Sequence, residues 1–208
     1  MKLRETLLTL TVVLLGVAAL AQDSASKFEV AVDYSYARFV PASKYVPNSY
    51  SLNGAGGSID YNFSRYVGVV AEFTGYGSNT QFFTVPPSSL CPSGCSGNVQ
   101  ANLFTYLFGP QFGIRTGKFR PFAHVLVGGA HSNLAANLAA LSGFSAAARP
   151  ANDAFALAFG GGLDIRVNHS GTIAFRPAEI DYLYTRFDIN GNGGNSNFRY
   201  QAGVVFNF

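Results

Sequence analysis

Large apolar residues and small or polar residues alternate at every second position along most of this chain. Between residues 28 and 40, Phe28, Val32 and Tyr34 share one face, while Glu29 and Asp33 share the other. A period of two residues is typical of a β-strand whose faces meet different surroundings. The same alternation predicts further strands in six segments: 52–64, 67–74, 100–115, 155–167, 172–187 and 199–208.

Two segments depart from this simple pattern. Residues 119–131 are apolar on both faces, which still predicts a strand but leaves the orientation of His124 open. Within 172–187, Pro177 has no N–H to donate to a neighbouring strand. We therefore expect a β-bulge at Pro177 that shifts the alternation by one residue.

The connections between these eight predicted strands alternate in length. The short connections are at 64–66, 116–119 and 168–171. The long connections are polar or rich in glycine, at 41–50, 77–99, 132–152 and 188–197. Tight turns at one end and long loops at the other are typical of membrane barrels, and eight strands can close without an unpaired edge. The sequence therefore predicts an all-β fold, an eight-stranded antiparallel up-and-down transmembrane β-barrel.

Composition agrees with a membrane location. The chain is 48% hydrophobic but only 12% charged, about half the charged fraction of a typical soluble protein. The small net charge of +3 comes from scattered residues, which excludes the basic patches of nucleic-acid-binding proteins. The polar faces are too sparse in Lys and Glu for a soluble exterior, so we place the aromatic face toward lipid. A soluble, exported ligand-binding barrel is the alternative.

The first segment predicts export. Lys2 and Arg4 precede an apolar run over 7–20, which ends in a small-x-small site before Gln22. This is the pattern of a secretory signal peptide. We predict cleavage between Ala21 and Gln22, a signal peptide at 1–21 and a barrel domain at 22–208; an uncleaved membrane anchor is the alternative.

The chain has two cysteines, Cys91 and Cys95, in a segment rich in Pro, Ser and Gly. An exported protein meets an oxidising compartment, where a local disulfide is expected to form in preference to free thiols. Such a short enclosed loop would shape a loop tip rather than hold the fold together.

Isolated charges fall on the faces that we assign to the barrel interior. Ionised groups in a narrow interior must be paired, because an unpaired buried charge costs several kcal/mol. We expect a structural salt-bridge network that fills the lumen; a proton path or a gated channel is the alternative. Its predicted members are Glu29, Asp33, Asp60, Glu72, Arg115, Asp164, Arg166, Arg176, Glu179, Asp181 and Arg199.

Several segments resemble the small outer-membrane barrels that include OmpX and the transmembrane domain of OmpA. The resemblance rests on LFGPQFGIR at 107–115, RPFAHVLVGG at 120–129, FGGGLDIRVN at 159–168 and IAFRPAEIDYLYTRF at 173–187. It implies a filled interior, mobile exposed loops and insertion by the outer-membrane assembly machinery. The end of the chain resembles the family's assembly signal, at Tyr200, Val204, Phe206 and Phe208. The periplasmic domain of full-length OmpA-like proteins is expected to be absent.

Some barrels of this kind are lipid A deacylases or acyltransferases, so a lipid-modifying enzyme is the alternative function. The deacylase type resembles a strand-borne His-x-Ser pair, but His131 is directly followed by Ser132 and His124 has Leu126 two positions on. His169 falls in a short turn. Because the three histidines are far apart in sequence, we predict no catalytic, metal-binding or cofactor-binding residues.

The sequence thus predicts a monomeric protein of the bacterial outer membrane with a structural, adhesion or surface-interaction role. Its expected partners are outer-membrane lipid and lipopolysaccharide, the assembly machinery during insertion, and an extracellular ligand that contacts the loops. No nucleic acid is expected among them.

Overall fold

The computed structural model describes residues 26–40, 49–78, 81–85, 87, 92–99, 102–132, 153–187 and 194–208. The predicted signal peptide and its cleavage site at Ala21 and Gln22 lie outside these residues. So does Cys91, and with it the predicted disulfide. None of the described residues forms a helix long and apolar enough to cross a membrane.

Eight antiparallel strands close into one barrel, which confirms the predicted fold. In order around the barrel, the strands are β1 (Phe28–Phe39), β10 (Asn195–Asn207), β9 (Ile173–Arg186), β8 (Asp153–Arg166), β7 (Phe119–Ser132), β6 (Asn102–Gly113), β3 (Val67–Gly77) and β2 (Tyr50–Asn62). The first and last strands pair with each other, from Glu29 with Asn207 to Arg38 with Phe198. Because this pairing closes the sheet, none of these strands leaves an open edge.

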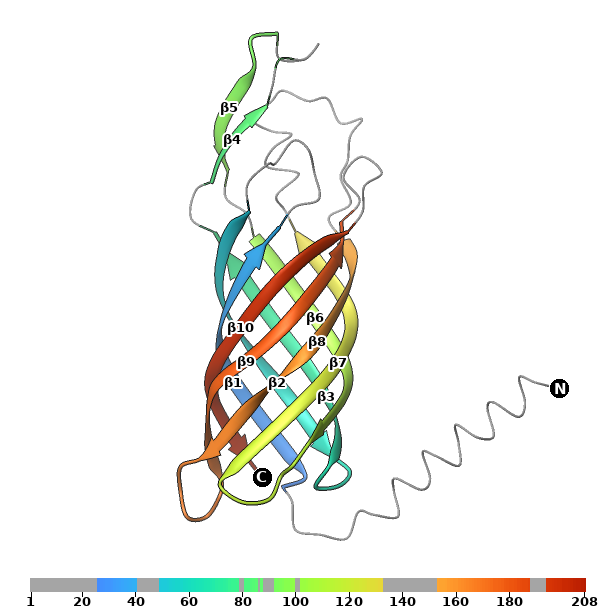
Figure 1. Ribbon diagram of the computed structural model, residues 1–208, viewed down its shortest axis with the longest axis vertical. Helices are drawn as coiled ribbons and strands as arrows, with labels where there is room; N and C mark the ends of the chain where they lie inside the picture. Colours follow the sequence, from blue (N-terminus) through green and yellow to red (C-terminus); the bar gives the residue numbers. More distant parts are fainter. Residues whose placement is uncertain are drawn as a thin grey trace, which may run out of the picture.

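The two ends of the barrel differ, as the connection lengths predict (Figure 1). The turns that follow β2, β6 and β8 lie at the same end as the C-terminus, which we call the turn side. The opposite end is the loop side. Local chemistry fixes the turns: Ser64 Oγ accepts from the backbone N–H of Val67 (3.1 Å), and Gly117 has φ +81°, a conformation that favours glycine.

A feature that the sequence reasoning missed lies between β3 and β6. The residues predicted as a loop at 77–99 contain β4 (Gln81–Val85) and β5 (Cys95–Val99), which pair with each other as a separate two-stranded sheet. Figure 1 shows this hairpin beyond the loop side of the barrel. Strand β10 also begins earlier than predicted, at Asn195, because Asn197 continues the inward face next to Thr185.

Side-chain exposure follows the predicted alternation. Large residues on the outer face are exposed, for example Phe159 (48%) and Val32 (59%). Residues one position away point into the barrel and are buried, for example Asp33 and Ala158. The outer surface is thus apolar and aromatic, while small, polar and charged groups occupy the interior.

The structure also confirms the bulge at Pro177. Both neighbours of β9 shift register at this point, β8 between Leu163 and Ile165 and β10 between Gln201 and Gly203. The extra residue makes Arg176 and Glu179, which are three apart, both point inward. Their side chains meet, with Arg176 Nη1 2.8 Å from Glu179 Oε2. The bulge therefore brings an opposite charge next to Glu179.

Candidate functional site

The barrel interior, or lumen, is the candidate functional site, and its contents change along the barrel axis. Toward the loop side, buried apolar side chains form a cluster that we call the apolar cluster. Its largest members are Phe39, Leu52, Tyr76, Leu107, Leu126, Leu183 and Phe187. The charged inward side chains lie in the middle of the barrel and toward the turn side, among glycines, uncharged polar groups and a small apolar cluster of Ala31, Ala174 and Val205.

The structure places the predicted interior residues as follows. Ten are buried: Glu29, Asp33, Asp60, Glu72, Arg115, Asp164, Arg176, Glu179, Asp181 and Arg199. The eleventh, Arg166, is only half-buried.

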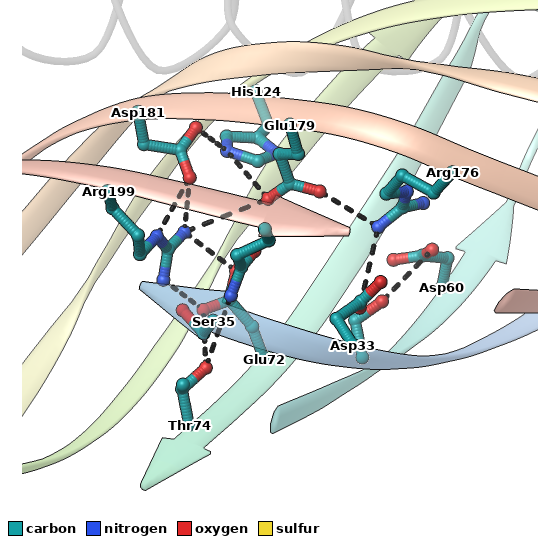
Figure 2. A network of polar contacts seen from close by, with 12 residues as sticks. Asp33, Ser35, Asp60, Glu72, Thr74, His124, Arg176, Glu179, Asp181 and Arg199 are labelled. Carbon is teal, nitrogen blue, oxygen red and sulfur yellow. Dashed lines mark hydrogen bonds and ion pairs between the residues drawn. The ribbon is translucent and has the colours of Figure 1, made fainter. Parts of the chain in front are cut away.

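Arg199 on β10 joins three strands in the middle of the barrel (Figure 2). Its side chain is fully buried and donates hydrogen bonds to both carboxylate oxygens of Glu72 on β3. Its Nε donates to Asp181 Oδ2 on β9 (2.8 Å). One guanidinium therefore holds two carboxylates from opposite directions, which its planar fork of donors allows.

Arg176 on β9 is the second centre of this network. Its Nε and Nη2 donate to the two oxygens of Asp164 on β8, at 2.7 and 3.2 Å. Its Nη1 donates to Glu179 and lies 3.8 Å from Asp33 Oδ2 on β1. The guanidinium also packs 4.6 Å from the ring centroid of Phe122, an aromatic residue that faces the lumen.

His124, whose orientation the sequence left open, points into the lumen and is buried. Its Nε2 lies within hydrogen-bond distance of Asp181 Oδ1 (2.9 Å) and 3.9 Å from Glu179 Oε1. Figure 2 shows the three side chains facing one another between Arg199 and Arg176. One ligand atom from each of the three lies within 4.8 Å of the other two, the one such metal-competent group among the described residues.

Glycine makes room for this contact. Gly160 on β8 lies between His124 on β7 and Asp181 on β9, and pairs with both. A Cβ added at Gly160 would strike both the Asp181 carboxylate and the backbone carbonyl oxygen of Ile180. The absence of a side chain at Gly160 thus lets the Asp181 carboxylate lie across β8 toward the histidine.

A smaller cluster occupies the turn side. Arg120 on β7 forms an ion pair with Glu29 on β1, and its Nη1 donates to Asn207 Oδ1 (2.7 Å). Arg115 Nε lies 3.8 Å from the same Glu29 carboxylate. This cluster therefore contains two guanidinium groups and one carboxylate.

Arg166 departs from its predicted pairing role. Among the described residues it makes no ion pair; its Nη2 lies 3.4 Å from the carbonyl oxygen of Arg115. The reason is its position at the end of β8, where its side chain lies against Gly171 of the following turn. Arg120, which the sequence analysis did not include in the network, forms an ion pair with Glu29.

The central ion-paired network has more acid than base. It contains five buried carboxylates and two guanidinium groups, which leaves three negative charges (five minus two) while His124 is neutral. The carboxylates are Asp33, Glu72, Asp164, Glu179 and Asp181. Such an excess is costly in a low-dielectric interior unless protons or a cation neutralise it.

Sequence reasoning left Arg120 out of the interior network and the orientation of His124 open for a common reason. Both lie on β7, where small or apolar residues follow on both faces, so alternation gave no direction. The sequence did place Arg120 and His124 on one face of this strand, because both are at even positions, together with Phe122 and Leu126. Only the register with β8, which pairs Arg120 with Asp164, identifies this row as the inward one.

The other two histidines lie at opposite ends of the barrel. His131 is exposed near the loop side, with Nδ1 2.8 Å from Asp153 Oδ1. His169 is exposed in the turn that follows β8. The residues of the predicted assembly signal lie on the outer face of β10 and just after it, with Phe208 73% exposed.

A closed antiparallel barrel with an apolar exterior and a polar lumen defines a membrane-spanning β-barrel, since closure satisfies every strand edge in lipid. The barrel strands have 11 to 14 residues, enough to cross a bilayer at a tilt. A family model described as the outer membrane protein beta-barrel domain matches residues 7–208. The chain belongs to this family, and it is a β-barrel of the bacterial outer membrane.

Solved structures agree on the fold. The chain is similar to Neisserial surface protein A, with 14% identity and a TM-score of 0.59 over 89% of this chain and 100% of that one. It is also similar to outer membrane protein OprG from Pseudomonas aeruginosa, with 15% identity and a TM-score of 0.54 over 88% of this chain and 97% of that one. No curated protein matches the chain.

Proposed function

We propose that this protein is a surface-interaction barrel with a non-conducting lumen, whose loop side contacts molecules outside the cell. The observation that carries the proposal is the filling of the lumen at two levels. Buried ion pairs occupy the middle, and the apolar cluster lies between them and the loop side. An eight-stranded barrel is narrow enough for its own side chains to fill.

The loop side supports an exterior role. Its connections are longer than the turns, and one of them carries the β4–β5 hairpin beyond the barrel (Figure 1). Tyrosine hydroxyls on the outer face near this end have polar partners, such as Tyr34 with Asn53 (2.6 Å) and Tyr182 with Ser196 (2.5 Å). Such tyrosines suit the boundary between lipid and water. The proposed contacts are lipopolysaccharide around this rim and an extracellular ligand at the loops.

Two measurements test this proposal. In planar bilayers, the folded protein is expected to give no stepwise conductance; regular single-channel steps would reject the closed lumen. On intact cells, an epitope inserted at Pro92–Ser93, between β4 and β5, is expected to bind antibody and to be removed by added protease. Binding only after the cells are opened would reverse the orientation.

The alternative function, a lipid-modifying enzyme, is tested by a separate measurement. Expression of such an enzyme would change the mass of lipid A, which one mass spectrum of extracted lipid A measures. We expect no change, because His131 is paired with Asp153 at the rim and His124 is buried among ionic groups.

Export and the disulfide are separate parts of the proposal. The mature protein is expected to begin at Gln22, and the intact mass of protein isolated from outer membranes tests this; a retained 1–21 segment would support the anchor alternative. Cys91 and Cys95 are expected to react with an alkylating reagent only after reduction. Alkylation without reduction would show free thiols.

A further inference from the structure

Three ligand atoms converge in the middle of the lumen without taking part in the proposed surface role. His124 Nε2, Asp181 Oδ1 and Glu179 Oε1 come from β7 and β9, and all three side chains are at least 98% buried. The histidine nitrogen lies 2.9 Å from the aspartate oxygen and 3.9 Å from the glutamate oxygen. Ligands of a tetrahedral Zn²⁺ ion lie about 3.3 Å apart, given metal–ligand distances near 2.0 to 2.1 Å. Both observed separations are within about 0.6 Å of that value.

The outer oxygens of the two carboxylates are already held. Arg199 Nε donates to Asp181 Oδ2 (2.8 Å), and Arg176 Nη1 donates to Glu179 Oε2 (2.8 Å). Asp181 Oδ1 and Glu179 Oε1 are directed toward His124, as Figure 2 shows, and Arg199 Nη2 lies 3.8 Å from Glu179 Oε1, beyond hydrogen-bond distance. Hydrogen-bonded outer partners of this kind orient the ligands in metal sites and strengthen binding.

The charge around these atoms favours a cation independently of their geometry. The ion-paired network has three more carboxylates than guanidinium groups. A divalent cation among them would remove most of this excess in a place where water cannot screen it. A hydrogen bond between neutral His124 and Asp181 does not change this excess of three negative charges.

We propose that the lumen binds one divalent transition-metal ion, of which Zn²⁺ is the best match, through His124, Glu179 and Asp181. A neutral imidazole with its proton on Nδ1 presents Nε2 as a ligand. One nitrogen and two carboxylate oxygens suit Zn²⁺ and its first-row neighbours, whereas Ca²⁺ takes six or more oxygen ligands. The ion links β7 to β9 across β8, and so adds a cross-link inside the barrel.

The position of the site decides how it must be loaded. The apolar cluster lies between these residues and the loop side, and the Arg120–Glu29 pair lies toward the turn side. Metal is therefore expected to enter as the barrel folds, and to leave slowly afterward. Adding an ion to the folded protein is not a sufficient test.

The experiment folds the full chain from denaturant into detergent with Co²⁺ or Zn²⁺ present, then removes free metal by gel filtration. Folding is checked by heat-dependent migration on a gel, and bound metal is measured by mass spectrometry. The native barrel is expected to retain about one ion, and Co²⁺ to give visible absorption bands. His124→Asn is expected to retain at least about tenfold less metal, since removing even outer partners of a ligand costs that much.

The chain offers matched controls. His131→Asn and His169→Asn remove the other two histidines and are expected to retain the metal fully. Asp33→Asn removes a carboxylate of the same network without removing a ligand, and is also expected to retain metal. Loss in Asp33→Asn equal to that in His124→Asn would show charge attraction without coordination and would overturn the proposal.

A second measurement applies if His124→Asn does not fold. In the native barrel folded with Zn²⁺ and labelled with ¹⁵N at histidine, one Nε2 resonance is expected to shift relative to the metal-free barrel. No retained metal in the native barrel would show that protons alone neutralise the network, and would reject the site. Retention unchanged in a folded His124→Asn barrel would reject it as well.

Discussion

The lumen is filled in two different ways: by the ion-paired network in its middle, which we call the ionic level, and by the apolar cluster toward the loop side. The ionic level depends on particular partners, since one side chain, Arg199, bonds both Glu72 and Asp181. The apolar cluster depends on volume, with side chains such as Leu107 and Leu126 filling space without directed bonds. Charged groups in a low-dielectric interior leave costly unpaired partners when one is removed, whereas apolar groups leave only a cavity. The ionic level should therefore be the less tolerant of substitution.

The largest effect is expected from Arg199→Met. This change leaves Glu72 and Asp181 buried without their guanidinium, which should lower the free energy of unfolding by about 3 to 5 kcal/mol. Urea unfolding followed by circular dichroism measures the loss. Arg186→Met is the matched control, because Arg186 is exposed and surface changes are usually within about 0.5 kcal/mol. Equal losses in the two variants would refute the role of Arg199.

A smaller loss is expected in the apolar cluster. Leu107→Ala opens a cavity at a fully buried position and should cost about 2 to 4 kcal/mol in the same unfolding measurement. Leu107→Met nearly conserves volume and should cost less than about 1.5 kcal/mol. If both exchanges cost the same, volume does not govern this level of the lumen.

The smallest effect of the three is expected from Gly160→Ala. The added Cβ would strike both Asp181 Oδ1 and the backbone carbonyl oxygen of Ile180, so the variant should lose about 1 to 3 kcal/mol of stability and the contact between His124 and Asp181. Gly75→Ala on the outer face of β3 is the control, since its Cβ would have its nearest neighbour, Phe104, at an ordinary 3.9 Å. Histidine chemical shifts report the contact, and an unchanged His124 signal in Gly160→Ala would contradict this account.

The features that could be predicted from the sequence are those that residues within a single strand determine. Glu29 and Asp33 alternate with Phe28, Val30 and Val32, so the strand and its inward face follow from one period. Pro177 likewise identifies its bulge, because a missing N–H is a property of that residue alone. These features need no knowledge of neighbouring strands.

Other features depend on register between strands. The sequence does not show that Gly160 lies beside both His124 and Asp181, so the grouping with Glu179 was missed when histidines were compared only with one another. The pairing of Arg120 with Glu29 joins residues 91 positions apart. The β4–β5 hairpin was missed because it lies outside the barrel pattern that organised the strand assignment.

The central claim is the division between an outer face in lipid and a lumen of buried polar groups. The chain has no Trp, so one introduced Trp is a unique fluorescent probe. Phe159→Trp places it on the exposed outer face, and Phe122→Trp places it in the lumen beside Arg176. In vesicles of bromine-labelled lipid, this account predicts strong quenching of Trp fluorescence in Phe159→Trp and little in Phe122→Trp. Equal quenching, or stronger quenching in Phe122→Trp, would contradict it.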